Sequence, residues 1–182
     1  MRSDAQRNHD LIVAAAVEVF SDGGTEASLD AVAKRAGVGP GTLYRHFPTR
    51  EDLIDAVMRS WVTRLQDAAE RAATSEAPPE ELLHAWFGDV IAQICRHRGS
   101  PARLLGALGN PDSPIAGKCN VLIESNAKVL DRVRHDGALR PDVDSLEVCR
   151  LVGAVAMAAD QGDLDAATID VMVRVVADGL VI

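Results

Sequence analysis

The sequence predicts an all-α protein with about nine helices. Apolar residues recur at helical spacing through almost the whole chain, clusters of Gly, Pro and Asn separate the periodic segments, and no segment alternates as a strand does. Of the 182 residues, 47% are hydrophobic and 25% are charged, which is typical of a chain that buries a core. The length suits one large domain, or a small domain attached to a larger one.

The N-terminal quarter predicts three helices. Gly23 ends the first, Ser28 and Gly37 bound the second, and Pro40 opens a third that has about two turns before Pro48. The apolar stripes of the first two helices are Ile12, Ala16, Val19 and Phe20, and Leu29, Val32, Ala33 and Ala36.

The rest of the chain predicts one long helix followed by shorter ones. Thr49 is a suitable cap for the long helix, which continues to a break at residues 74–80. Further breaks fall at residues 109–114 and 136–144. The helices expected among these breaks cover residues 82–98, 102–108, 115–135, 146–161 and 166–180.

The net charge of −8 is unevenly distributed. Residues 1–50 contain six basic and six acidic side chains, so the whole excess of acid belongs to residues 51–182. Residues 31–50 contain four basic side chains and no acidic one. Because local charge decides where a polyanion binds, the acidic total does not exclude a nucleic acid partner.

Cysteine usage and hydropathy predict a cytoplasmic protein. Cys95, Cys119 and Cys149 lie far apart in no metal-ligand spacing, so we expect buried thiols in a reducing compartment. No apolar run approaches the roughly 20 residues of a membrane helix. The N-terminal segment lacks the features of a secretory signal. We expect no metal site and no cofactor.

The segment GVGPGTLYRHF, residues 37–47, allows two interpretations. A phosphate-binding loop follows a β-strand and supplies backbone N–H groups, whereas this segment follows a helix and Pro40 has no N–H. A short helix, a glycine turn and a second short helix instead predict a helix-turn-helix. Leu43 and Phe47 would then face the core, and the side chains between them would face outward.

The stretch LDAVAKRAGVGPGTLYRHFPTREDL, residues 29–53, closely resembles the DNA-binding signature of TetR-type transcriptional regulators. The turn A-x-x-A-G-V, the run G-T-L-Y-R-H-F and the following Pro-x-basic-Glu-x-Leu coincide in order and spacing. The resemblance implies a helix-turn-helix domain over residues 1–50 and a ligand-binding and dimerisation domain over residues 51–182. It also implies a double-stranded DNA operator, a homodimer, a small-molecule effector that weakens operator binding, and a nucleoid-associated location in the cytoplasm.

The resemblance also assigns roles to residues. Thr42 and Arg45 match positions that reach base edges or adjacent phosphates, whereas Tyr44 and His46 match phosphate contacts. Many family members have a polar residue at the positions of Gly39 and Pro40, so base recognition here depends more on other side chains. The expected DNA-binding set is Ser28, Lys34, Arg35, Gly39, Pro40, Gly41, Thr42, Tyr44, Arg45, His46 and Arg50.

Each assignment has a structural alternative. Tyr44 could be a half-buried aromatic residue and His46 a solvated one. Lys34 and Arg35 could form an ordinary exposed face, and Arg50 could pair with a helix neighbour such as Asp55. The whole constellation nevertheless favours DNA binding.

Large apolar residues of the middle helices could line an effector cavity, and the alternative is that they form ordinary core. The expected pocket set is Trp61, Leu65, Trp86, Phe87, Val90, Ile94, Leu104, Leu108, Ile123, Asn126 and Met157. The other polar candidates are His84, Gln93, Asn120, Asp160 and Gln161.

The last two helices carry apolar stripes that predict a two-fold four-helix dimer interface, with internal core as the alternative. The expected interface set is Leu151, Val155, Ala158, Ala159, Ile169, Met172, Val173, Val176 and Leu180.

Two other functions compete with that of an effector-controlled repressor. An enzyme is not expected, because no recognisable catalytic constellation is present. A DNA-bound regulator that answers to a protein partner, without a small-molecule inducer, stays open. A filled core would favour that alternative, whereas an enclosed cavity with a few polar groups would favour an effector.

Overall fold

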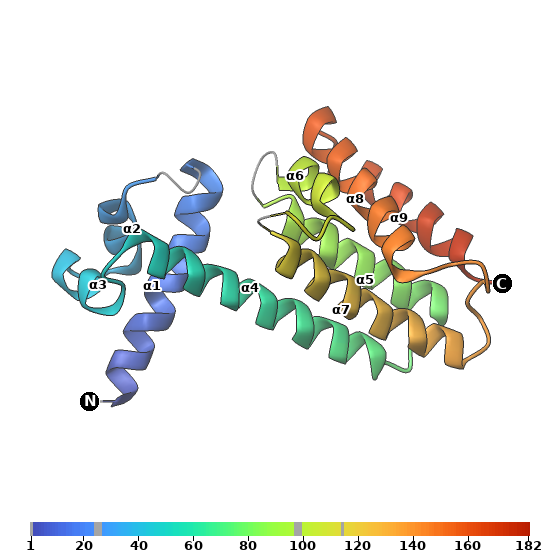
Figure 1. Cartoon of the computed structure of the whole chain (residues 1–182), viewed down its shortest axis with the longest axis horizontal. Helices are drawn as coiled ribbons and strands as arrows, with labels where there is room; N and C mark the ends of the chain where they lie inside the picture. Colours follow the sequence, from blue (N-terminus) through green and yellow to red (C-terminus); the bar gives the residue numbers. More distant parts are fainter. Residues whose placement is uncertain (1, 24–26, 97–99, 114) are drawn as a thin grey trace. The chain divides into compact units, whose positions relative to one another are not determined.

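The computed structural model describes residues 2–23, 27–96, 100–113 and 115–182, which form nine α-helices (Figure 1). The helices are α1 (Arg2–Gly23), α2 (Leu29–Ala36), α3 (Pro40–His46), α4 (Arg50–Ala73), α5 (Pro79–Ile94), α6 (Ser100–Ala107), α7 (Ala116–His135), α8 (Ser145–Gly162) and α9 (Ala166–Leu180). In the described ranges, extended pairing is limited to one antiparallel bridge between Leu139 and Val181. The predicted all-α fold is confirmed.

The observed helix bounds differ from the expected ones by a few residues. Pro79 opens α5 earlier than expected, because proline suits the first turn of a helix. Cys95 caps α5 at its C-terminus, and residues 97–98 of the expected helix lie outside the described residues. Residues 24–26, including Gly24 directly after α1, also lie outside them.

The chain divides into two compact units, Met1–Thr63 and Arg64–Ile182. The boundary falls inside α4, so one helix contributes to both units. The boundary after Thr63 reflects how the helices pack, whereas the expected boundary after residue 50 separates a DNA-binding domain from a ligand-binding domain. The functional boundary therefore stays a prediction.

The first unit is a small helical domain around one hydrophobic core. Both α1 and α3 pack against α2. Leu43 and Phe47 are buried, as the helix-turn-helix interpretation predicts. The core consists of Ile12, Val13, Ala15, Ala16, Phe20, Leu29, Val32, Ala33, Leu43, Phe47, Leu53, Ala56 and Val57.

Local signals place the helix-turn-helix. The Ser28 hydroxyl accepts a hydrogen bond from the Asp30 N–H over 3.2 Å, which caps α2. Gly37 has a φ of 69°, the left-handed conformation that favours glycine, and ends α2. The Gly37 N–H donates to the Lys34 carbonyl over 3.2 Å, and the Val38 N–H donates to the Ala33 carbonyl over 3.0 Å. This pair of bonds is a Schellman motif, which fixes the turn between the two helices.

The start of α4 is closed by a reciprocal cap. The Asp52 N–H donates to Thr49 Oγ1 over 3.1 Å, and the Thr49 N–H donates to Asp52 Oδ2 over 3.0 Å. The hydrogen bonds from Thr49 hold the pKa of Asp52 below its usual value. The cap that the sequence predicts at Thr49 is therefore present.

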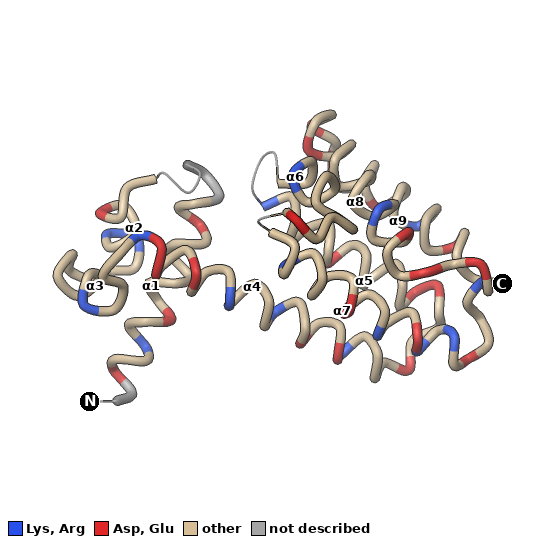
Figure 2. Tube along the Cα trace, in the orientation of Figure 1, with Lys and Arg blue, Asp and Glu red and all other residues tan. Residues whose placement is uncertain are grey.

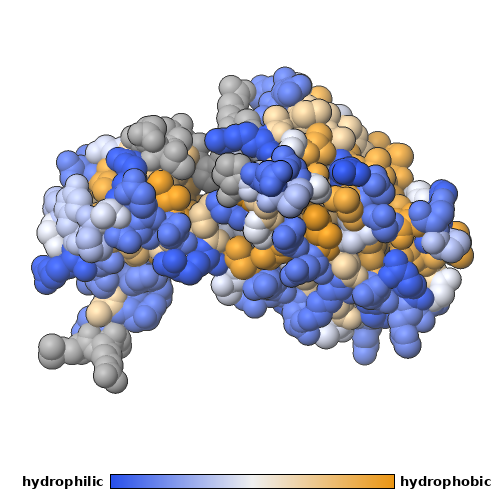
Figure 3. Space-filling view, in the orientation of Figure 1, coloured by the Kyte–Doolittle hydropathy of each residue, from blue (hydrophilic) through white to orange (hydrophobic). Residues whose placement is uncertain are grey.

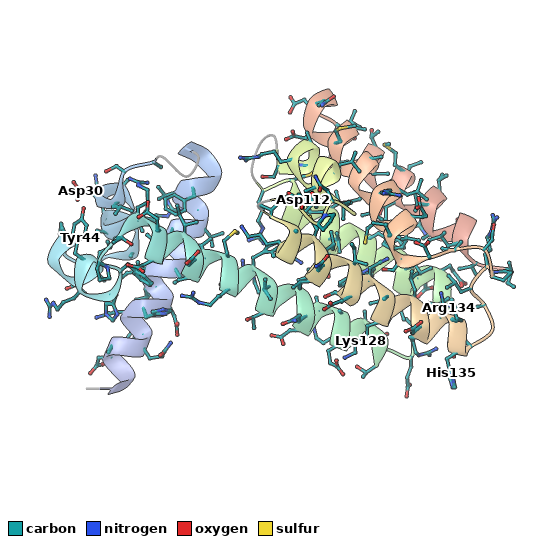
Figure 4. All side chains as sticks on the ribbon, in the orientation of Figure 1. Asp30, Tyr44, Asp112, Lys128, Arg134 and His135 are labelled. Carbon is teal, nitrogen blue, oxygen red and sulfur yellow. The ribbon has the colours of Figure 1, made fainter. Side chains whose placement is uncertain are left out.

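The second unit is a helical bundle. Within it, α5 packs against α7, α8 and α9, and α6 packs against α7 and α8. An ion pair between Lys128 and Glu70 joins α7 to the last part of α4 (Figure 4). The Arg140 N–H donates to the Leu180 carbonyl over 3.0 Å, which holds the end of α9 to the segment between α7 and α8.

Candidate nucleic-acid interface

The exposed surface of α2 and α3 is the candidate nucleic-acid interface. Figure 2 shows basic positions on both helices. Tyr44 stands on the outside of α3 with 47% of its surface exposed (Figure 4). Arg45 is exposed, and its Nε donates to the Gly41 carbonyl one turn earlier over 3.3 Å. Thr42 is half-buried beside them.

Lys34 and Arg35 differ in their surroundings although they are neighbours in the sequence. Lys34 is exposed and has no ion-pair partner among the described residues. Arg35 is exposed as well, but its guanidinium is paired with the carboxylate of Glu18 on α1. Lys34 is therefore available to a phosphate at once, whereas Arg35 must first leave Glu18.

The structure gives Arg50 a different contact from either expected one. Its Nη1 donates to the Ala27 carbonyl over 2.8 Å, which ties the first residue of α4 to the segment before α2. This bond is neither the predicted phosphate contact nor the alternative pair with Asp55. A backbone carbonyl gives no signal in the sequence, so the contact could only be found in the fold.

His46 is half-buried and packs against aromatic rings, so it is less solvated than its alternative interpretation supposed. Its ring centroid lies 6.3 Å from that of His9 on α1 and 6.3 Å from that of Phe47. The rings of His9 and Phe47 are 5.1 Å apart. His9 thus joins the candidate interface. Helical periodicity identifies only the buried stripe of α1, so it does not reveal His9.

The start of α3 offers backbone and no capping side chain. Gly39 is the N-cap residue, with an extended backbone at a φ of −70°, and Pro40 occupies the first turn. A Cβ atom at Gly39 or Gly41 would meet no other atom within 4 Å. Steric crowding therefore does not require these two glycines, and they leave open surface next to Tyr44.

The expected pocket residues are divided between a cavity and the surrounding core. A cavity of about 10 Å³ lies between α5, α7 and α8. It is lined by Trp86, Phe87, Val90, Ile94, Leu122, Asn126, Cys149 and Val152. Leu122, Cys149 and Val152 were missed, although Cys149 and Val152 share a helix face at the i, i+3 spacing.

The remaining pocket candidates do not line this cavity. Leu65, Leu104 and Leu108 are buried, and Trp61, Ile123 and Met157 are half-buried. Among the polar candidates, His84 Nε2 on α5 lies 2.9 Å from Asp170 Oδ1 on α9, which is close enough for an ion pair when the histidine is protonated, although the geometry is not that of a hydrogen bond. The side-chain amide oxygen of Gln93, Oε1, is buried and has no hydrogen-bond partner within the described part of the chain.

The expected interface residues fall into two classes. Val155, Ala159, Val173 and Leu180 are buried inside the chain, so they contribute to its own core. Leu151 is 50% exposed, whereas Ala158, Ile169, Met172 and Val176 are half-buried. Val171 and Val175 are 61% and 68% exposed and were not expected. Figure 3 shows hydrophobic surface over α8 and α9.

Family models match both parts of the chain. The model described as "Bacterial regulatory proteins, tetR family" matches residues 12–57. The model described as "Transcriptional regulator SbtR-like, C-terminal domain" matches residues 78–182.

Curated relatives and solved structures agree with these matches. The regulator UidR of Escherichia coli is 30% identical over 84% of this chain and 79% of its own. The repressor KstR of Mycolicibacterium smegmatis is 28% identical over 84% of this chain and 75% of its own. A TetR regulator from Streptomyces coelicolor superposes with a TM-score of 0.76 and 34% identity, over 95% of this chain and 98% of its own. A TetR regulator from Mycobacterium vanbaalenii superposes with a TM-score of 0.71 and 30% identity, over 100% of this chain and 99% of its own.

The fold and the exposed α2–α3 surface define a helix-turn-helix DNA-binding protein. The chain belongs to the TetR family of transcriptional regulators. These relatives are regulators rather than enzymes. No described helix is long and apolar enough to cross a bilayer, and the described residues hold no group of three or more His, Cys, Asp or Glu suited to a metal ion.

Proposed function

We propose that this protein is a repressor that binds a palindromic operator as a homodimer and leaves it when a largely apolar small molecule binds the second unit. The exposed Tyr44 and Arg45 of α3, together with the exposed Lys34 of α2, which has no ion-pair partner among the described residues, are the observation that supports the DNA-binding part. A recognition helix enters the major groove, and basic neighbours contact the phosphates on either side.

A homodimer is part of the proposal because a palindromic operator presents two half-sites about 34–36 Å apart, one for each recognition helix. The exposed side chains of Leu151, Val171 and Val175 support α8 and α9 as the surface that a second copy covers. Large aliphatic side chains gathered on one surface commonly mark an interface. The half-buried Ala158 and Val176 would lie at its edge.

The second candidate is a DNA-bound regulator that responds to a protein partner. The small volume of the cavity, about 10 Å³, favours this candidate, because that space holds no more than one water molecule. The buried Asn126 on its wall favours an effector, because a few polar groups in an apolar pocket are typical of ligand sites.

The DNA-binding proposal is tested with a duplex that the protein itself selects from a random-sequence library. Tyr44→Ala should weaken binding to the selected duplex and to an unrelated duplex about equally, because phosphate contacts carry no sequence information. Arg45→Ala should reduce the ratio of the two affinities, by about 1–3 kcal/mol if a bidentate base contact is lost. If both variants bind both duplexes as the wild type does, α3 is not the recognition helix.

A further inference from the structure

Asn126 holds the central position of a buried hydrogen-bond network at the cavity wall. Only 2% of its surface is exposed. Trp86 Nε1 donates to Asn126 Oδ1 over 3.0 Å. On the other side, Asn126 Nδ2 donates to the Ser145 carbonyl over 3.1 Å and to Ser145 Oγ over 3.2 Å. The network thus connects α5, α7 and α8.

The partners of Asn126 fix which way its amide group points. The Ser145 hydroxyl donates to the Ile123 carbonyl over 2.6 Å, so its oxygen can only accept from Asn126. A carbonyl group likewise only accepts, and an indole N–H only donates. Both sides therefore require the NH₂ group to face Ser145 and the oxygen to face Trp86. Asn126 therefore presents an acceptor, and no donor, on the side of Trp86.

The rest of the cavity wall is apolar and uncharged. Besides Trp86 and Asn126, its members are Phe87, Val90, Ile94, Leu122, Cys149 and Val152. The Cys149 sulfur is directed at the Leu122 carbonyl, 4.0 Å away. Burial raises the pKa of the Cys149 thiol to about 12, so this group stays neutral. A carboxylate or phosphate placed here would lose its hydration and gain no partner.

Space for a ligand has to come from a side chain of the wall. The cavity of about 10 Å³ is too small for any organic molecule. Trp86 has the largest side chain in the wall, and its one polar atom is bonded to Asn126. Displacing its indole would open a flat space and free the Asn126 acceptor at the same time.

The geometry points to a specific effector class, and this inference rests on the proposed effector function. We propose that the effector is a flat, uncharged, mostly apolar molecule with one N–H or O–H donor, which displaces the Trp86 indole and donates to Asn126 Oδ1 in its place. Trp86 then serves as an internal stand-in for the effector, and Asn126 is the residue that determines specificity.

The test removes the Trp86 side chain and offers its ring as a free molecule. Indole should raise the melting temperature of Trp86→Ala, and benzothiophene, which has the same shape without the N–H, should bind more weakly. Adding Asn126→Leu should lower the indole-to-benzothiophene affinity ratio by about 5- to 10-fold. Trp86→Phe is the comparison variant, because it removes the donor but keeps much of the space filled, so indole must displace the phenyl ring and should bind it more weakly than Trp86→Ala.

The remaining arms separate this inference from the proposed function. If Trp86→Ala does not fold, Trp86→Leu replaces it and leaves a smaller space. If the double variant does not fold, the indole-to-benzothiophene affinity ratio of the single variant is the deciding measurement. Equal affinity for indole and benzothiophene, tighter binding of indole-3-acetate than of indole, or no binding of indole would overturn the inference. If indole binds through Asn126 but leaves the affinity for the selected duplex unchanged, the pocket chemistry stands and the effector function fails.

Discussion

The guanidinium of Arg50 donates a hydrogen bond from Nη1 to the backbone carbonyl of Ala27 over 2.8 Å. Arg50 is the first residue of α4, and Ala27 precedes the cap of α2, so this bond joins two segments that are 23 residues apart. Arg50 is half-buried. We infer that it positions the helix-turn-helix in addition to any contact with DNA.

Replacing Arg50 should therefore loosen the first unit. Arg50→Ala should reduce the protection of α2 amides against hydrogen exchange by about 1.5–3 kcal/mol, the range for a hydrogen bond to a charged group. Amides of α5 to α9 should be unaffected, because they belong to the other unit. Arg50→Lys should restore only part of the effect, since lysine lacks the planar guanidinium. Unchanged protection together with lost DNA affinity would instead assign Arg50 to phosphate binding alone.

The unequal environments of Lys34 and Arg35 lead to the second prediction. Lys34→Ala should reduce the dependence of log affinity on log salt by about 0.9 for an unrelated duplex, which corresponds to one lost phosphate contact. Glu18→Gln should free Arg35 and remove an acid near the DNA, so affinity should rise and the salt dependence should become steeper. Glu124→Gln makes the same charge change in the second unit and should have no effect. An unaltered salt dependence in Lys34→Ala would place α2 away from the DNA.

The sequence was sufficient for the elements whose signals are local. Ser28, Gly37, Pro40 and Thr49 act through their own backbone or near neighbours, so the bounds of the first helices follow from residue type and spacing. The inward positions of Leu43 and Phe47 follow from helical periodicity in the same way.

Contacts between distant segments could not be predicted from one sequence. The Arg50–Ala27 bond, the Glu18–Arg35 pair and the packing of His9 against His46 depend on how the helices meet. Periodicity also cannot show which apolar face of a helix packs inside its own chain and which one contacts a second copy. Val155 was therefore assigned to the dimer interface although it is buried in the chain, whereas the exposed Val171 and Val175 were not assigned to it.

The dimer prediction uses the exposed residues for this reason. Leu151→Asp combined with Val175→Asp should give a folded monomer, because both side chains are exposed in the single chain and a second copy would bury the new charges without partners. Leu11→Asp is the control, because Leu11 is 42% exposed on α1 and the variant should stay dimeric. Light scattering measures the mass, and circular dichroism checks the helix content. A folded double variant that stays dimeric would move the interface elsewhere.

A pH prediction follows from the buried thiol of Cys149. Its pKa is raised from 9.0 to about 12, mainly by burial. At a pH below the pKa of the thiol in the unfolded chain, the thiol is protonated in both the folded and the unfolded protein, and its contribution to the free energy of unfolding is fully present. As the pH rises above about 9, the unfolded chain loses the proton first, so the free energy of unfolding falls by up to about 1.4 kcal/mol per pH unit.

Urea unfolding at a series of pH values from about 8 to 11, under a reducing agent, measures this slope. Cys149→Ala should make the slope shallower, whatever its effect on absolute stability. Cys95→Ala should change it less, because Cys95 is less buried. If the slope is the same in wild type and Cys149→Ala, the thiol titrates in the folded protein as it does in the unfolded chain.

The final prediction concerns how an effector would reach the DNA-binding surface. The helix α4 runs without interruption from Arg50 to Ala73, about 36 Å at 1.5 Å per residue, and crosses the boundary between the units at Thr63. An effector with a 100-fold preference for the arrangement that cannot bind DNA supplies about 2.7 kcal/mol of coupling per site, and DNA must then weaken effector binding by the same factor.

We predict that α4 carries this coupling. Thr63→Pro, which interrupts the helix, should therefore keep operator affinity but bring the factor by which DNA and effector weaken each other's binding close to one. Thr63→Ala keeps the helix and should keep the coupling. Titrating a compound found by thermal-shift screening into the protein alone and into its operator complex measures the factor, and a full 100-fold effect in Thr63→Pro would exclude α4 as the connection.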